Sequence, residues 1–198
     1  MLSSRLLRVA LPVLVLPFVR TTPAAAIVGV GIEPKAIYTS TTAGDLNANY
    51  SSSAGGGYQF GVDAKWGKGV WIRPGLHWRE LGFDLQQVAP GGSDGVSFSG
   101  LYVPVVAGVG LDLKIVSFAL GAGPTYQHVA SVGDNDFAIG DDDVESSQFG
   151  AKVMAQASAF GITLEGAYEQ GFDSVLKNDA EYGESKLEIW SIGLGMKF

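Results

Sequence analysis

The sequence predicts an all-β protein, a single eight-stranded antiparallel up-and-down transmembrane β-barrel with short periplasmic turns and long extracellular loops. Three observations predict this fold. Apolar and polar residues alternate with a period of two in eight segments after residue 26, and two is the period of a β-strand. The connections between these segments are long and short in turn. One face of the segments is apolar and uncharged, and the other carries charges of both signs.

Residues 1–26 are expected to be a signal peptide. Arg5 and Arg8 give a basic start, an apolar stretch follows from Val9 to Val19, and a run of alanines ends at Ala26. These are the three parts of a secretory signal. The apolar stretch is about half the roughly 20 residues that a spanning helix needs. We therefore expect export, a barrel domain over residues 27–198, and a location in the outer membrane of a Gram-negative cell.

The composition excludes several classes of function. Without residues 1–26 the chain keeps 10 basic and 20 acidic residues, a net charge of −10, which argues against a nucleic-acid partner. The chain has no cysteine, so it has neither disulfides nor thiol chemistry. It carries 28 glycines and 21 Trp, Tyr and Phe residues together, a composition typical of strands and turns. No nucleotide, zinc or phosphate-loop motif is present, and no cofactor is expected.

The alternation is clearest in Tyr58–Trp66, where every even position is apolar. After the turn 67–69 it resumes from Val70 to Arg79, and the two segments predict a hairpin. Each segment is long enough for a membrane strand of about 9–11 tilted residues. The expected strands lie near 27–38, 58–66, 70–79, 97–112, 115–129, 147–159, 162–172 and 185–198.

The lengths of the connections also indicate an outer-membrane barrel. The long connections are 39–55, 87–96, 130–146 and 173–184, and the short ones are 67–69, 113–114 and 160–161. An even number of strands places both termini on the short-turn, periplasmic side. Pro34, Pro74, Pro104 and Pro124 fall inside strands, where each removes a ladder N–H, so we expect bulges or rim positions there.

The charged face is expected to line the lumen and to form ion pairs, because eight strands enclose only enough room for side chains. The expected lumenal charge network is Glu33, Lys35, Asp63, Lys65, Arg73, Arg79, Asp112, Lys152, Glu165, Glu169 and Lys197. The apolar face is expected to meet lipid, since an apolar belt around a whole barrel exceeds what soluble monomers expose. The opposite arrangement, a soluble lipocalin-like barrel binding a small apolar ligand, remains an alternative.

Aromatic residues are expected to form girdles at the two membrane surfaces. The residues concerned are on the apolar face toward strand ends: Tyr38, Tyr58, Trp66, Trp78, Tyr126, Tyr168 and Trp190.

Several segments resemble the PorT-like family of outer-membrane β-barrel proteins. They are the hairpin from Tyr58 to Trp66 leading into 72–76, the segments 101–104 and 121–124, and the terminal Phe198. The resemblance covers most of residues 27–198 and implies similar proline-containing strands. It implies no catalytic residues, because the family is defined by architecture. The alternating end from Trp190 to Phe198 is similar to the signal that the barrel-assembly machinery reads, which makes that machinery an expected partner.

No residue pattern predicts catalysis, and we expect no enzyme. His77 is expected to point into the lumen. His128 and Ser131 are three residues apart, so they face opposite sides of a strand. Glu165 and Glu169 share a face, where ion pairs with lumenal bases are expected rather than acid–base chemistry.

The third long connection is acidic. Its carboxylates are a candidate cation-binding loop, since clustered carboxylates hold calcium or magnesium: Asp134, Asp136, Asp141, Asp142, Asp143 and Glu145. Their spacing does not match the calcium-loop pattern. The alternative is a solvated, mobile loop.

These observations together predict an integral outer-membrane protein with a structural or surface-interaction role, a filled lumen and no catalysis. Outer-membrane lipid and lipopolysaccharide are the expected partners. A narrow channel or an accessory component of a transport or secretion system is the alternative.

Overall fold

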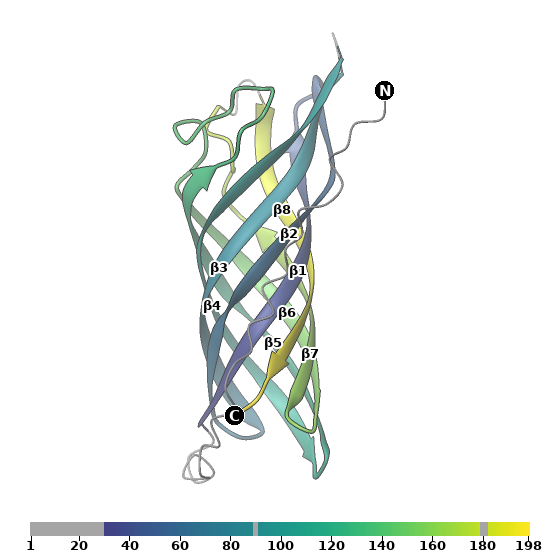
Figure 1. Ribbon diagram of the computed structural model, residues 1–198, viewed down its shortest axis with the longest axis vertical. Coiled ribbons are helices and arrows are strands. Elements are labelled where there is room, and N and C mark those ends of the chain that lie inside the picture. Colours follow the sequence, from purple (N-terminus) through teal and green to yellow (C-terminus); the bar gives the residue numbers. More distant parts are fainter. Residues whose placement is uncertain (1–29, 89–90, 179–181) are drawn as a thin grey trace.

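The computed structural model describes residues 30–88, 91–178 and 182–198, which form a closed ring of eight antiparallel strands in chain order (Figure 1). The predicted fold class is thereby confirmed. The expected signal peptide and residues 27–29 lie outside the described residues. The strands are β1 (Val30–Leu46), β2 (Tyr50–Trp66), β3 (Val70–Gln87), β4 (Gly92–Leu113), β5 (Val116–Val132), β6 (Ser147–Ala159), β7 (Ile162–Gly171) and β8 (Gly183–Met196).

The first and last strands close the ring. Each strand pairs with its neighbour in sequence, and β1 pairs in addition with β8, from Lys35 opposite Gly195 to Leu46 opposite Gly183. Closure removes the unpaired edges that would otherwise invite aggregation. Among the residues described, no helix is long and apolar enough to cross a membrane.

Three short connections lie at one end of the barrel, which we call the turn end; the C-terminus lies there too (Figure 1). The connection between β6 and β7 consists of Phe160 and Gly161, which have φ values of 52° and 82°. Two successive left-handed residues are the geometry that matches the twist of paired strands. The opposite end, which holds the other four connections, is the loop end.

Two of the expected long loops are mostly strand, which corrects the predicted boundaries. β1 continues to Leu46 and β2 starts at Tyr50, and β3 continues to Gln87 while β4 starts at Gly92. These segments are rich in Ser, Thr and Gly, which are typical of turns, yet their backbone stays paired. Among the described residues, only 133–146 and 172–178 belong to long connections, and Figure 1 shows the first of them folded over the loop end.

The four strand prolines cause no bulge, so of the two expectations, bulges or rim positions, the first is wrong. Pro34 lies opposite Val62 and Pro124 opposite Ala151, with the register unchanged on either side. The register shifts occur elsewhere, at 44/46, 54/58 and 99/100. In a closed ring the pairs before and after each proline hold the register, so the missing N–H does not displace the strand.

The outward face of every strand carries an apolar belt that starts at the turn end. The belt ends in a ring of aromatic side chains on seven of the eight strands: Tyr38, Tyr58, Trp78, Tyr126, Phe149, Tyr168 and Trp190. Several of these residues are cross-strand neighbours, such as Tyr168 beside Trp190 with ring centroids 4.8 Å apart. β4 places Leu101 opposite Trp78 at this level.

Beyond the aromatic ring the outward positions become polar. Trp78 is followed by Glu80 and Leu101 is preceded by Ser99, and these two polar residues again lie opposite each other. On β3 and β4 the change from apolar to polar therefore occurs at the same paired positions. It divides the molecule into a part with an apolar exterior and a part with a polar exterior.

The interior changes character at a corresponding level. Beside the belt it holds buried charged and polar side chains together with a small apolar cluster of Trp71, Val106, Ala119, Met154 and Ala167. Toward the loop end it holds an apolar core that we call the plug, which combines strand residues with residues from the two long connections. The plug consists of Ala43, Leu81, Phe83, Leu85, Val96, Phe98, Ile139, Val144, Val175, Leu176, Leu187 and Ile189.

Candidate functional site

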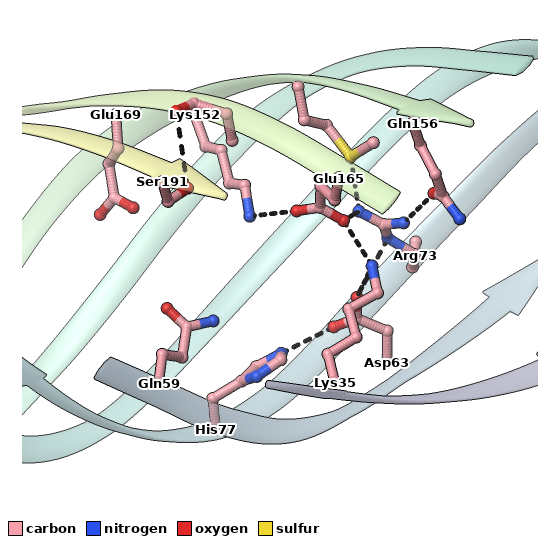
Figure 2. A network of polar contacts seen from close by, with 12 residues as sticks. Lys35, Gln59, Asp63, Arg73, His77, Lys152, Gln156, Glu165, Glu169 and Ser191 are labelled. Carbon is pink, nitrogen blue, oxygen red and sulfur yellow. Dashed lines mark hydrogen bonds and ion pairs between the residues drawn. The ribbon is translucent and has the colours of Figure 1, made fainter. Parts of the chain in front are cut away.

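The buried charged side chains of the interior come from inward positions of five strands, β1, β2, β3, β6 and β7, which alternate with the apolar positions of the belt. Figure 2 shows side chains from opposite walls meeting in the middle. Glu165 on β7 is the centre of the larger cluster. Its carboxylate accepts hydrogen bonds from Lys152 Nζ at 2.8 Å and Arg73 Nη2 at 2.9 Å, and it also pairs with Lys35. The single carboxylate of Glu165 thus shares its negative charge among three basic side chains.

Asp63 on β2 extends this cluster toward the adjacent wall. Its carboxylate lies 2.8 Å from Lys35 Nζ and 3.3 Å from Arg73 Nε. His77 Nε2 lies 2.7 Å from the other carboxylate oxygen. Glu33 completes the set, with Lys35 Nζ at 3.4 Å. Lys35 and Arg73 each pair with the three carboxylates of Glu33, Asp63 and Glu165, so neither of these two charges depends on one partner.

A second cluster lies closer to the loop end. Arg79 donates two parallel hydrogen bonds to Glu169, at 3.0 and 2.7 Å. Tyr102 Oη and Thr125 Oγ1 donate to the same carboxylate at 2.7 and 3.1 Å, and Gln59 Oε1 accepts from Arg79 Nε at 2.9 Å. Bidentate Arg–carboxylate pairs with additional donors are the strongest arrangement for a buried ion pair.

The two clusters are balanced in charge. Four buried acids, Glu33, Asp63, Glu165 and Glu169, face four buried bases, Lys35, Arg73, Arg79 and Lys152. A balanced and hydrogen-bonded set avoids the cost of an isolated charge in a dry interior. The arrangement fills and braces the barrel, and within the described chain every one of these eight groups has an ionic partner.

Eight of the eleven residues expected in the lumenal network are these buried ones. The other three lie at the turn end: Lys65 is half-buried, and Asp112 and Lys197 are exposed. All three are on the inward side of their strands and line one pocket at the mouth of the barrel. The alternation of residues indicates which face a side chain is on, but it does not indicate how deep in the barrel it lies.

Sequence reasoning missed the uncharged members of the site. Gln59, Tyr102 and Gln156 all bind charged groups in the interior. The alternation could have indicated them, since each is an even number of positions from a charged residue on its own strand and therefore lies on the same, inward face. The plug was also missed, although Leu81, Phe83 and Leu85 follow Arg79 at the same parity.

The acidic connection is packed rather than loosely solvated. Ile139 and Val144 are buried in the plug, and the backbone of Val144 bridges to that of Leu176 in the other long connection. Asp141 Oδ1 accepts from the N–H of Val132 at 2.8 Å. Over residues 30–88, 91–178 and 182–198, no three His, Asp or Glu side chains come together as a metal site, so Asp134, Asp136, Asp141, Asp142, Asp143 and Glu145 are not gathered around one point.

The histidines take no part in a catalytic arrangement like those considered from the sequence. His77 binds Asp63 inside the barrel. His128 is exposed, and its Nδ1 lies 3.0 Å from the carbonyl oxygen of Ser146.

No protein-family model matches the sequence, and no curated protein matches it either. Several solved structures are similar to this chain. Neisserial surface protein A has a TM-score of 0.49 and 14% identity, over 86% of this chain and 97% of that chain. The attachment invasion locus protein Ail of Yersinia pestis has a TM-score of 0.44 and 15% identity, over 85% and 99%. The outer membrane enzyme PagL has a TM-score of 0.47 and 11% identity, over 82% and 98%. Likeness at this level carries no residue roles to this chain, and the resemblance to PorT-like proteins stays a hypothesis.

Proposed function

We propose that this chain is an integral outer-membrane β-barrel protein with a structural or surface-interaction role and no catalytic activity. The observation that carries the proposal is that, beside the belt, apolar residues face outward and charged residues face inward. There the exterior is apolar and the interior holds eight buried acidic and basic side chains. A protein in water has the opposite arrangement, whereas an outer-membrane barrel has this one.

The exposed apolar area supports lipid rather than water around the belt. Phe118, Leu120 and Trp190 are 51%, 61% and 64% exposed, and comparable residues follow on all sides of the ring. Soluble monomers rarely expose apolar patches beyond a few hundred Å². A lipocalin-like barrel would need most of its apolar side chains inside at this level, where the interior holds eight buried acidic and basic side chains and only a small apolar cluster.

The loop end supports a role at the cell surface. Beyond the aromatic ring the strands continue with a polar exterior, and the long connections pack onto the plug. The described residues of this part include 13 acids (Asp45, Glu80, Asp84, Asp94, Asp134, Asp136, Asp141, Asp142, Asp143, Glu145, Asp173, Glu184 and Glu188) against Lys177 and Lys186. A surface this acidic fits cationic partners, or contact with lipopolysaccharide through divalent cations.

The narrow-channel alternative is less well supported. The two ionic clusters occupy the cross-section beside the belt, and the plug closes the interior beyond them. Conduction would require both to open. Stable single-channel conductance steps in a planar bilayer would favour the channel over a filled barrel.

Fractionation and heat-modifiable migration test the proposal. We expect the protein to sediment with outer membranes and to require detergent for extraction. An unboiled sample is expected to migrate faster than a boiled one, because the closed barrel resists unfolding. Release with the periplasmic fraction without detergent would contradict the membrane assignment.

A further inference from the structure

One strand of the barrel continues at the loop end without a neighbour on one side. β3 and β4 stay paired throughout 82–87 and 92–97, whereas β4 and β5 pair only as far as Phe98 opposite Val132. Figure 1 shows β4 continuing past the end of β5. We call the segment 92–96 of β4 the free edge, because it has a paired strand on its β3 side only.

The free edge offers unpaired backbone groups. The carbonyl group of Ser97 points away from β3, since it accepts a hydrogen bond from the N–H of Gly133 at 2.8 Å. In an antiparallel sheet every second residue directs its N–H and C=O to the same side of the strand. The N–H and C=O groups of Ser93 and Gly95 therefore also face away from β3. Both residues are exposed, and within the described residues neither has a hydrogen bond on this side.

The connection 133–146 does not cover the free edge. Val96 is buried in the plug, so Asp94 lies on the same, inward face of β4. The N–H of Asp136 donates to the carboxylate of Asp94, and Phe137 packs against the plug. The connection therefore crosses the inward face of β4 toward the plug and leaves the backbone groups of the free edge accessible.

The surroundings of the free edge are acidic and contain no blocking residue. Asp84 on β3 lies directly across from the middle of the free edge, and Asp134 and Asp136 are exposed on the adjacent connection. No lysine or arginine occurs in 80–113 or in 130–146. Sheet edges are commonly protected by a lysine, a proline or a bulge, and the free edge has none of these.

We propose that the free edge binds an extended, basic segment of a partner polypeptide, which adds to the sheet as a further strand. Main-chain hydrogen bonds to Ser93 and Gly95 hold the segment in register, and the surrounding carboxylates favour lysine and arginine side chains. The inference names a partner for the proposed surface-interaction role, and it rests on the loop end lying outside the membrane.

Hydrogen exchange of single amides is the direct test. The full chain, ¹⁵N-labelled and refolded in maltoside micelles, is mixed with an acetylated octapeptide of alternating threonine and lysine. The amides of Ser93 and Gly95 are expected to exchange about tenfold more slowly with the peptide. The amides of Asp94 and Val96 face β3 and are expected to change little. The same peptide N-methylated at every residue cannot donate hydrogen bonds and is expected to slow none of them.

Two variants at one position separate strand pairing from other contacts. Gly95→Pro removes the N–H on the open side and keeps the bonds to β3, which the neighbouring residues make. Gly95→Ala keeps this N–H, and its Cβ has room, since the nearest atom is Asp84 Oδ1 at 3.5 Å. The proline variant is expected to bind a fluorescent form of the octapeptide about tenfold more weakly than the alanine variant, measured by fluorescence anisotropy.

Several outcomes overturn the proposal. They are equal affinity of the two variants, slowed exchange with the N-methylated peptide, and absence of slowed exchange at Ser93 and Gly95 with the threonine–lysine peptide. Equally tight binding of an octapeptide with glutamate in place of lysine overturns the basic chemistry of the partner. Failure of the membrane assignment would appear in the fractionation experiment and not in these measurements, which are made in detergent.

Discussion

The same strands form both halves of the barrel, but the two halves place their apolar and polar residues on opposite sides of the barrel wall. Beside the belt, Arg73 and Arg79 of β3 point inward and are buried, while Ile72 and Trp78 point outward and are exposed. Toward the loop end of the same strand, the buried inward residue is Phe83. The outward-facing positions there hold polar residues such as Asp84. The same alternate positions face inward along the whole of the strand. Only the kind of residue at the inward and outward positions changes.

The comparison shows that the polarity of the outer surface and the kind of side chain in the interior change together along the barrel. Where the exterior is apolar, the interior holds two clusters of paired charges beside a small apolar cluster. Where the exterior is polar, the interior is an apolar core of the ordinary soluble kind. The aromatic ring marks the boundary between the two regimes, as expected for residues with one apolar and one polar side.

Removal of the central acid should have the largest effect on the ionic half. Glu165→Gln leaves Lys35, Arg73 and Lys152 with an excess of buried positive charge. Breaking a buried ionic set in this way costs about 3–5 kcal/mol. We expect that decrease in the free energy of unfolding, measured by urea titration of the lipid-refolded protein. Glu184→Gln is the control, because its side chain is 62% exposed and its ion pair among the described residues is with Lys186. An equal effect of both variants would show that burial in the interior is not what matters.

Truncation of the plug should affect the other half slightly less. Leu85→Ala removes a fully buried side chain of the plug and is expected to cost about 2–5 kcal/mol in unfolding free energy. Val88→Ala, on an exposed residue three positions along the same hairpin, should cost less than about 0.5 kcal/mol. If Leu85→Ala were as mild as Val88→Ala, the loop end would not be a packed core.

A charge on the exterior separates the two regimes. Leu120→Arg places a cation in the belt, and its expected cost is about 2–4 kcal/mol if the position lies near the middle of a bilayer. Ser99→Arg, beyond the aromatic ring on the neighbouring strand β4, is expected to be nearly neutral. Unfolding in lipid vesicles measures both. In water a residue as exposed as Leu120 would tolerate arginine, so equal stability of the two variants would contradict a membrane around the belt.

The smallest effect is expected in the acidic connection. Asp141→Ala removes the acceptor for the N–H of Val132, which costs about 1 kcal/mol. Asp142→Ala is the matched control, since this exposed residue gives only its backbone carbonyl, to Lys177. The free energy of unfolding is measured with and without EDTA. A stability loss on chelation that both variants abolish would indicate a bound cation.

Much of the fold could be predicted from residue parity. In Tyr58–Trp66 the even positions face outward and the odd ones inward, as the alternation indicated. The extensions of β1 and β2 could not be found in this way. Serines and glycines at 51–57 replace the apolar outward residues there, because this part of the strand has no apolar surroundings to match.

The partners inside the barrel were harder to predict than the face. Lys35 and Glu165 are 130 residues apart in sequence and meet across the interior, and which pairs form depends on the shear of the ring. Lys65 and Lys197 have the same parity as the buried bases but lie at the mouth. Parity is a local property, whereas depth is set by the tilt of all eight strands together.

The pairing of β1 with β8 has a consequence for the order of folding. Lys35 is on the first strand, and its partner Glu165 is on the seventh. Until the last strand has been synthesised and docked along β1, the cations and carboxylates on the inward faces have no enclosed space in which to pair. Assembly of the interior must therefore be a late and concerted event, with one long-range closure replacing the stepwise growth that neighbouring hairpins would allow. A chain shortened at its C-terminus would lack β8 and could not close the ring. The charged residues of the interior would then also fail to pair.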